Sequence, residues 1–333
     1  MKIAFFEIED WEKDTLSKEL TGHTVEFSRE PLSEKNCATY SGLEIISPFI
    51  YSSLNPATFS KLSKLKMIAT RSTGFDHIDL QQCKEKGILV SNVPSYGTDT
   101  VAEHTFALIL AISRKIIASV ERTKRGDFSL EGLTGYNLSG KILGIVGLGK
   151  IGKRVAEIAL AFKMKVLVST DQPDNEFVQM NNLTLCGLKE LLSESDIVTL
   201  HLPLTANTRH LLNKENMKSI KRGAVLINTA RGPIVETEAL VSALESGALS
   251  YAGLDVLEEE FALKEERELL SEGFLNKFDL RAQLLNHVIL NKENVIVTPH
   301  NAFNSEESLR EILKITKENI LGFIEGRPSN IVH

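Results

Sequence analysis

The chain has 333 residues, more than one compact domain usually contains, so its length predicts two domains that each bury a core. Hydrophobic residues make up 42% and charged residues 25% of it, which is the balance of a globular protein. The formal net charge of -6 argues against a partner with a phosphate backbone, so we expect no nucleic-acid partner.

The cysteines Cys37, Cys83 and Cys186 lie far apart, with neither the spacing of a metal site nor that of a disulfide framework. We therefore expect reduced thiols, no metal ion and a cytoplasmic protein. The longest apolar run, Phe106 to Ile112, is too short to span a bilayer, and early acidic residues do not suit an export signal. No membrane partner is expected.

Short β-rich apolar runs alternate with helical stretches, which is typical of an α/β fold with mostly parallel sheets. A first block predicts strands at residues 2–8, 23–27, 44–50, 66–70 and 88–92. A second block predicts strands at residues 141–146, 165–169, 196–200, 224–228, 252–256 and 295–298.

Two helices are expected to connect these blocks. Residues 98–120 have the length and composition of one long helix that crosses from the first block to the second. Residues 305–325 are amphipathic and are expected to return to the first block, which makes the first domain discontinuous.

A glycine pattern stands at the start of the second block. Gly147, Gly149 and Gly152 form G-x-G-x-x-G between a strand-like run and a helical one. Such glycines permit a tight turn and a close approach of backbone N–H groups to a pyrophosphate, and the third lets helix and strand pack closely. We interpret the turn as a dinucleotide site; the alternative is a purely structural turn.

The end of the next strand bears on the choice of dinucleotide. Asp171 follows this strand and could bond the ribose hydroxyls while repelling a 2′-phosphate, and no Arg or Lys follows at once. The expected cofactor is therefore NAD.

Candidate catalytic residues follow three later strands. Arg231, in Asn-Thr-Ala-Arg-Gly, offers a planar fork that matches a carboxylate and can polarise a carbonyl oxygen; the alternative is a structural salt bridge. His300, in Val-Thr-Pro-His, is the candidate general acid and base, because its side chain titrates nearest neutrality. Glu260 ends an acidic run and is the candidate carboxylate beside His300. Taken singly, the acidic run could be a solvated face and His300 a polar loop residue.

A further candidate segment lies in the first block. Thr73 and Gly74 could present backbone N–H groups to a substrate carboxylate, although Gly74 also suits a plain turn. Tyr96 could close the pocket with an aromatic wall, or could instead be a packed hinge residue.

Together these segments resemble the D-isomer-specific 2-hydroxyacid dehydrogenase family over nearly the whole chain. The matching runs, in the family's order, are RSTGFDHID, NVPSYGTDTVAEHT, GIVGLGKIG, DIVTLHLPLT, NTARGPIV, GLDVLEEE and VTPH. The resemblance implies two flavodoxin/Rossmann-like parallel-sheet domains with the active site in the cleft, and a homodimer formed through the cofactor domain and the long helix. Residues 1–97 with 301–333 would bind substrate, and residues 98–300 would bind NAD.

The resemblance also implies roles for single residues. Arg231 would bind and activate substrate, His300 would be the acid/base, and Glu260 would be its partner. Cofactor contacts are implied for Lys150, Ile151, Thr170, Asp171, His201, Leu202, Pro203, Thr208, Thr229, Ala230 and Asp255.

One departure from the family pattern concerns the cofactor. Members that prefer NAD usually carry the acidic residue at the position of Thr170, whereas here Asp171 follows one residue later. Because neighbouring residues of a strand end can point to opposite faces, the shift predicts relaxed discrimination against NADP.

The substrate prediction depends on the family branch. The long segment 261–293 and the lack of a C-terminal regulatory domain resemble the D-lactate and D-2-hydroxyisocaproate branch more than the 3-phosphoglycerate branch. A small 2-keto or 2-hydroxy acid is expected, with D-lactate dehydrogenase activity favoured. The alternatives are a glyoxylate/hydroxypyruvate reductase, a 3-phosphoglycerate dehydrogenase, and a non-enzymatic NAD-sensing scaffold similar to the related corepressors.

Overall fold

The computed structural model describes residues 1–258, 260 and 280–332. The chain divides into two compact units, Met1–Tyr96 with Asn304–His333, and Gly97–Phe303. The first unit is discontinuous, and residue 97 and residues 301–303, which the prediction gave to the first domain, lie with the second unit. The assignment of substrate to one unit and cofactor to the other stays a prediction at this point.

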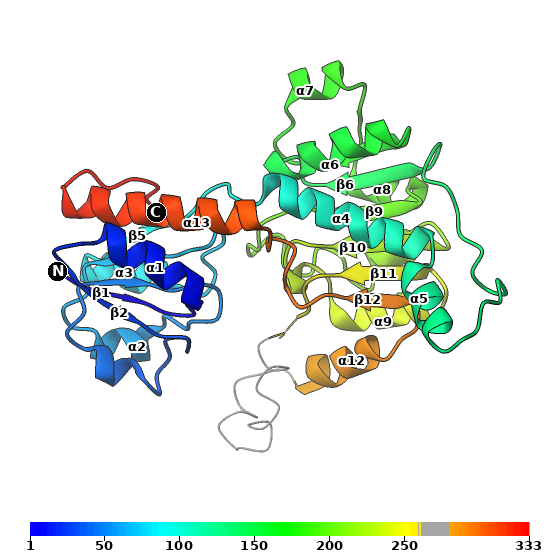
Figure 1. The fold of residues 1–333 in the computed structure, drawn as a ribbon. Coiled ribbons are helices and arrows are strands. Elements are labelled where there is room, and N and C mark those ends of the chain that lie inside the picture. The colour runs from blue at the N-terminus through cyan, green and yellow to red at the C-terminus, as the bar shows by residue number, and fades with distance from the viewer. Residues whose placement is uncertain (259, 261–279, 333) are drawn as a thin grey trace. The chain divides into compact units, whose positions relative to one another are not determined.

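The first unit, which contains both chain termini in Figure 1, is built on a parallel sheet. Its strand order is β2-β1-β3-β4-β5. Its strands are β1 (Lys2–Phe5), β2 (Thr24–Phe27), β3 (Ile45–Ser47), β4 (Met67–Ala69) and β5 (Leu89–Ser91). Its helical elements are α1 (Asp10–Glu19), η1 (Cys37–Tyr40), α2 (Pro56–Lys61), α3 (Leu80–Lys86) and α13 (Glu306–Ile324).

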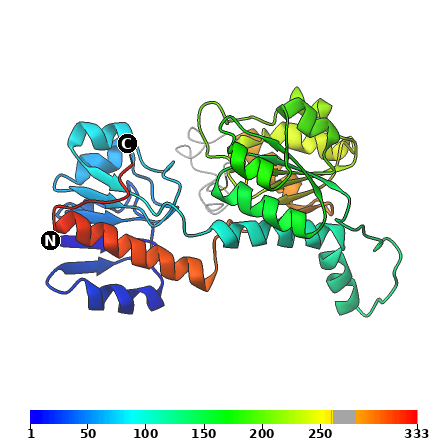
Figure 2. The same ribbon diagram turned by 90° about the horizontal axis from the view of Figure 1, so that it is seen from above.

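Successive side chains along the strands pack into different cores, so both faces of this sheet are buried. Ile3 of β1 packs in one core with Leu16 of α1 and Ile320 of α13. The next residue, Ala4, packs in another core with Phe59 of α2. Successive side chains of a strand point to opposite faces, so helices are needed on both. Figure 2 shows α13 lying along the first unit, as the amphipathic pattern predicted.

The second unit holds a longer parallel sheet with strand order β12-β11-β10-β9-β6-β7-β8. Its strands are β6 (Ile142–Val146), β7 (Lys165–Ser169), β8 (Thr184–Leu185), β9 (Ile197–Leu200), β10 (Ala224–Asn228), β11 (Leu249–Leu254) and β12 (Val295–Val297). Its helical elements are α4 (Thr98–Ser113), α5 (Ile116–Lys124), α6 (Lys150–Ala161), α7 (Asn175–Met180), α8 (Leu188–Glu194), η2 (Asn216–Ser219), η3 (Gly232–Ile234), α9 (Thr237–Glu245) and α12 (Leu280–Leu290).

Helices also cover both faces of this sheet. Phe106 of α4 and Val155 of α6 pack with Ile145 of β6 in one core. Leu191 of α8 and Leu240 of α9 pack in a second core on other strand residues. The predicted fold class, α/β with two parallel-sheet domains, is confirmed.

The prediction of one helix over residues 98–120 is wrong. The chain turns at Lys115, whose φ of 55° is left-handed and cannot continue an α-helix, so α4 ends and α5 begins there. The Nζ of Lys115 lies 3.7 Å from the ring centroid of Tyr251, and the carbonyl of Ser113 accepts the N–H of Tyr136. These tertiary contacts favour the break over continued helix.

Two smaller differences concern strands and a connection. The two-residue strand β8 was not predicted, because it is too short to give a pattern. The long connection predicted at 261–293 includes 261–279, which lie outside the described residues, and its later part forms α12. Among the helices that are described, none combines the length and apolar character needed to cross a bilayer.

Candidate active site

The candidate residues of the second unit follow the carboxyl ends of its strands. Gly147 follows β6, Thr170 follows β7, His201 follows β9, and Arg231 comes soon after β10. Glu260 and His300 follow β11 and β12. Because these strands are parallel, their carboxyl ends lie at one edge of the sheet, where open α/β sheets bind ligands.

The glycine turn is shaped by contacts that exclude larger side chains at two positions. Gly147 has a φ of 96°, and a Cβ there would lie 2.5 Å from the carbonyl oxygen of His201. A Cβ on Gly152 would lie 2.1 Å from the carbonyl oxygen of Gly147. At Gly149, directly before α6, a Cβ would meet nothing within 4 Å. The turn is thus packed at its base and open at the helix N-terminus, which fits the close approach of a pyrophosphate.

His201 is a neutral residue beside this turn. Its backbone N–H donates to the carbonyl of Val146 at 2.8 Å, and its Nε2 lies 3.0 Å from Thr199 Oγ1. Burial of the ring lowers the pKa of His201 to about 3. It therefore adds no positive charge to the site at neutral pH.

The end of β7 carries the residues that bear on cofactor choice. Thr170 is partly buried, and its Oγ1 accepts the N–H of Gln172 at 3.3 Å. Asp171 is exposed. Nearby, Lys153 of α6 pairs with Asp174 at 2.5 Å, so this lysine is already neutralised by a carboxylate.

Two predicted cofactor-contact segments are fixed by hydroxyl groups. Thr208 Oγ1 donates to the carbonyl of Pro203 at 2.6 Å and accepts the N–H of Thr205 at 2.7 Å. Thr229 Oγ1 lies 3.0 Å from Thr105 Oγ1 of α4. The prediction that Leu202, Pro203, Thr208, Thr229 and Ala230 contact cofactor stays a prediction; the structure shows the hydroxyl bonds of Thr208 and Thr229 to neighbouring segments.

Arg231 stands in a loop that Asn228 shapes. The side chain of Asn228 accepts the N–H of Ala230 at 3.0 Å and donates to the carbonyl of Arg231 at 2.9 Å. The Nη1 of Arg231 donates to the carbonyl of Ala230 at 2.8 Å. A buried amide thus sets the backbone from which the guanidinium projects.

The structure brings Glu260 and His300 together. Glu260 Oε1 lies 2.6 Å from His300 Nδ1, and Glu260 Oε2 accepts the N–H of Leu257 at 3.4 Å. Both side chains are mostly buried, with 18% and 19% exposed. This short contact between two segments far apart in the chain gives the arrangement that an acid/base imidazole needs.

Asp255 holds the segment that carries His300. Its carboxylate accepts Thr298 Oγ1 at 2.5 Å, Asn301 N at 3.0 Å and Ala302 N at 2.9 Å. From α4, His104 Nε2 lies 3.1 Å from Thr298 Oγ1. The predicted role of Asp255 as a cofactor contact stays a prediction; what the structure shows is a carboxylate that orders the loop around His300.

The predicted substrate residues of the first unit lie after β4 and β5. Thr73 Oγ1 donates to the carbonyl of Val93 at 2.7 Å, and Ser72 Oγ donates to that of Gly74 at 2.6 Å. In the described part of the chain, the backbone N–H groups of Thr73 and Gly74 meet no acceptor, so both can bind an anion. The carbonyl of Tyr96 accepts Ser308 Oγ at 3.0 Å.

Sequence reasoning missed several residues that shape these segments. They are His104, Asn228, Glu258 and Thr298, and in the first unit Arg71, whose buried guanidinium donates to the carbonyls of Phe6 and Glu7. All five stand inside the quoted motif runs, so membership of those runs was the available signal. Among the described residues, no three His, Cys, Asp or Glu side chains are grouped to hold a metal ion.

Comparison with known proteins decides the family. The model for the NAD binding domain of D-isomer specific 2-hydroxyacid dehydrogenases matches residues 106–302. The D-lactate dehydrogenase of Escherichia coli is 32% identical over 338 residues, covering 100% of both chains. The chain belongs to the D-isomer specific 2-hydroxyacid dehydrogenase family. It is therefore an NAD-linked oxidoreductase, and the predicted family, enzyme class and cofactor are confirmed.

Two further relatives bear on the substrate of this dehydrogenase. A glyoxylate reductase of Pyrococcus horikoshii is 33% identical over 332 residues, covering 96% of this chain and 91% of that one. The crystal structure of a D-lactate dehydrogenase from Aquifex aeolicus, complexed with NAD and lactic acid, matches with a TM-score of 0.88. That match is 35% identical and covers 99% of this chain and 98% of the other.

A methyl group on Gly149 should block cofactor without disturbing the fold. We expect Gly149→Ala to weaken NADH binding by about tenfold or more, because the added Cβ enters the space that the pyrophosphate needs. Fluorescence titration with NADH measures this effect. Gly187→Ala is the matched control, since Gly187 also precedes a helix with open space at its Cβ position. Equal NADH affinity in both variants would contradict the assignment.

The low pKa of His201 predicts a pH dependence of stability. As the pH falls below 6.5, the unfolded chain protonates this residue and the folded chain does not, until about pH 3. The free energy of unfolding should therefore fall with pH in this window, by up to about 1.4 kcal/mol per pH unit from this residue. Urea unfolding at about pH 7.5 and about pH 5.5 should show a smaller loss in His201→Gln than in the wild type. Identical losses of unfolding free energy in the two proteins would contradict the low pKa of His201.

Proposed function

We propose that this dehydrogenase is a D-lactate dehydrogenase, which reversibly reduces pyruvate or a similar small 2-keto acid with NADH. The contact between Glu260 and His300 carries the proposal, because reduction of a keto acid needs a proton donor held in one orientation. The similarity to a D-lactate dehydrogenase structure complexed with NAD and lactic acid supports the choice of substrate.

The proposed roles follow from the chemistry of each side chain. Bound NADH supplies the hydride that C2 of the keto acid accepts. A carboxylate only accepts hydrogen bonds, so His300 Nδ1 holds its proton toward Glu260, and Nε2 gives a proton to the C2 oxygen. Arg231 binds the substrate carboxylate and stabilises the negative charge that develops on oxygen.

The first unit contributes to the same proposal. The backbone N–H groups of Thr73 and Gly74, which meet no acceptor among the described residues, suit a carboxylate, as in other backbone anion sites. Tyr96 is proposed as the aromatic wall of the substrate pocket. In the direction of alcohol oxidation, His300 takes the hydroxyl proton that it would otherwise give.

A second candidate activity is reduction of glyoxylate. It is supported by the Pyrococcus horikoshii glyoxylate reductase, which is as similar in sequence as the Escherichia coli D-lactate dehydrogenase. Both reactions use the same acid/base and carboxylate-binding groups and differ in the side chain on C2. We also propose relaxed discrimination against NADPH, because the neutral Thr170 stands where an acidic residue would repel the 2′-phosphate.

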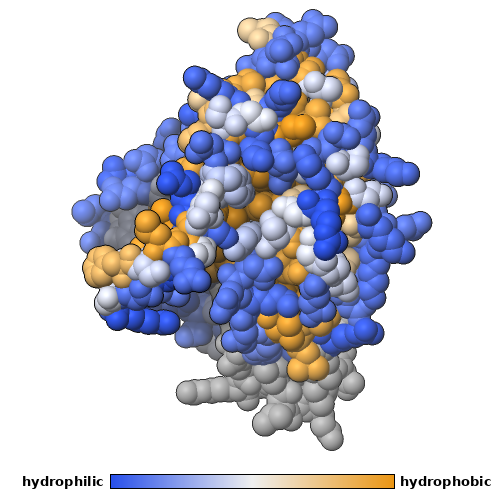
Figure 3. All heavy atoms as spheres, turned by 90° about the vertical axis from the view of Figure 1, so that its right-hand side faces the viewer, coloured by the Kyte–Doolittle hydropathy of each residue, from blue (hydrophilic) through white to orange (hydrophobic). Residues whose placement is uncertain are grey.

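We further propose a homodimer, formed through α5 and the segment that follows it. None of the residues of α5 is buried. A short helix is only marginally stable unless other parts of a protein pack against it. Ile116, Ile117 and Val120 are exposed there, and Phe128 and Leu130 are 78% and 81% exposed. Figure 3 faces this side of the second unit and shows apolar areas among the hydrophilic surface. A second copy would cover them. The cytoplasmic location stays a prediction.

A keto-acid panel tests the proposed activity. We expect the highest kcat/KM for NADH oxidation with pyruvate, relative to glyoxylate, hydroxypyruvate, 2-ketoisocaproate and phenylpyruvate, and measurable turnover with NADPH. His300→Ala should lower turnover by roughly 10²–10⁴-fold while NADH still binds, because it removes only the proton donor. His287→Ala is the control on α12. Preference for glyoxylate would favour the second candidate, and near-normal turnover of His300→Ala would reject the mechanism.

Sedimentation tests the homodimer. Val120→Asp places a charge on the exposed apolar face of α5, so we expect it to convert a dimer to monomers with little change in melting temperature. Met180→Asp is the control, since Met180 is 79% exposed on α7. Analytical ultracentrifugation of both variants and the wild type gives the masses. A monomeric wild type, or a Val120→Asp dimer, would rule out this interface.

A further inference from the structure

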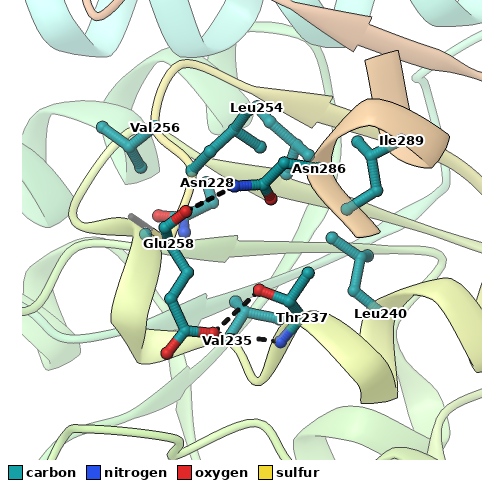
Figure 4. Close-up of a pocket in the computed structure, with 11 residues that line it drawn as sticks. Asn228, Val235, Thr237, Leu240, Leu254, Val256, Glu258, Asn286 and Ile289 are labelled. Carbon is teal, nitrogen blue, oxygen red and sulfur yellow. Dashed lines mark hydrogen bonds between the residues drawn. The ribbon is translucent and has the colours of Figure 1, made fainter. Parts of the chain in front are cut away.

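A second buried carboxylate, Glu258, lies two residues before Glu260 and has no role in the chemistry proposed above. Its side chain is 8% exposed, and both of its oxygens are bonded. Oε1 lies 2.7 Å from His210 Nε2 and 3.4 Å from Arg209 Nη2. Oε2 accepts Thr237 Oγ1 at 2.8 Å and Thr237 N at 3.3 Å, as Figure 4 shows.

These partners belong to two segments that the proposed function uses. Arg209 and His210 follow Thr208, in the segment expected to contact cofactor. Thr237 is the first residue of α9, which follows the Arg231 loop and η3. The helix N-terminus favours a negative charge, so the carboxylate of Glu258 is stabilised there as well as by His210 and Arg209.

The backbone of Glu258 is fixed independently of its side chain. Asn286 of α12 donates from Nδ2 to the carbonyl of Glu258 at 2.5 Å (Figure 4). A Cβ on Gly232, next to Arg231, would lie 2.4 Å from Glu258 N, so the two segments touch through their main chains. The N–H of His210 donates to the carbonyl of Pro233 at 2.8 Å.

Three functional segments thus meet at one carboxylate. They are the segment with Thr208, the loop with Arg231, and the turn that leads from β11 to Glu260. We propose that Glu258 is a positioning residue, which keeps the cofactor segment and the acid/base carboxylate Glu260 in register through its contacts with His210 and Thr237. The positioning of Glu260 for catalysis rests on the proposed function. The positioning of the cofactor segment rests only on membership of the NAD-binding family.

The alternative is that Glu258 only stabilises the fold. If the contact is only structural, its loss should lower the melting temperature and leave the NADH affinity and the kcat of the folded protein unchanged. A positioning contact should in addition weaken NADH binding and lower kcat, with little change in KM for the keto acid, because Glu258 touches no substrate. The split between kcat and KM therefore distinguishes the two roles.

The test compares three variants of the full chain. Glu258→Gln keeps the size of the side chain and removes its charge, and His210→Asn removes the partner while suiting the left-handed φ of 50° at this position. Glu245→Gln is the matched control, since Glu245 ends α9 and pairs only loosely with Lys292 at 3.5 Å. The NADH dissociation constant, kcat and KM for pyruvate, and melting temperature are measured for each.

We expect Glu258→Gln to raise the NADH dissociation constant several-fold and to lower kcat by about 10- to 100-fold, the scale of an imposed misplacement near an active site. His210→Asn should act in the same direction, and the double variant should be no worse than Glu258→Gln, because both remove one interaction. If Glu258→Gln does not fold, His210→Asn carries the test.

The outcomes separate this proposal from the proposed function. Unchanged NADH affinity and kcat in folded Glu258→Gln and His210→Asn would overturn the positioning role. A wild type that reduces no keto acid, with NADH binding still weakened in both variants, would reject the proposed function and retain the positioning of the cofactor segment.

Discussion

The placement of His300 depends on a buried carboxylate in another segment. Asp255, 1% exposed, accepts Thr298 Oγ1, Asn301 N and Ala302 N, so its bonds hold the chain on both sides of His300. His300 has a φ of 55°, which a residue with a Cβ adopts only at a cost in free energy. Because Asp255 directly follows β11, the pairing of β11 with β12 sets where the imidazole stands. Glu260, from the same segment as Asp255, then meets the ring at Nδ1.

The parallel sheet explains why residues so far apart in sequence can serve one site. The strands of the second unit end at the same edge, and several of the residues that follow them are held by bonds to a neighbouring strand. The N–H of His201 bonds to the end of β6, that of Asp255 bonds to the end of β10, and that of Thr298 bonds to the end of β11. The pairing of the strands therefore fixes the positions of these loop residues. Such fixed positions are needed to align acid/base and carboxylate-binding groups.

Sequence patterns predicted the parts of this arrangement that a local constraint imposes. The glycine spacing is itself a geometric requirement, so Gly147 and Gly152 could be recognised before any tertiary contact was known. The break at Lys115 could not, because it arises from a non-glycine residue whose partner, Tyr251, is 136 residues away. The sequence predicted Glu260 of the acidic run as the carboxylate beside His300, but it gave no signal that Glu258 faces α9. Both residues are glutamates, so only the path of the turn after β11 determines which neighbours each side chain meets.

In the second unit, the N-termini of α7 and α9 differ from that of α6 in that a side-chain carboxylate occupies each of them. The N-terminus of α9 is occupied by the chain's own Glu258, and that of α7 by Asp174, whose side chain accepts Phe177 N. The N-terminus of α6 begins at Gly149, which has no side chain to fill it. Since a helix N-terminus attracts negative charge, internal carboxylates satisfy α7 and α9, and α6 retains its capacity for a phosphate group. With His201 neutral beside it, the attraction at this turn comes from oriented backbone dipoles, which need no reorganisation when the cofactor binds.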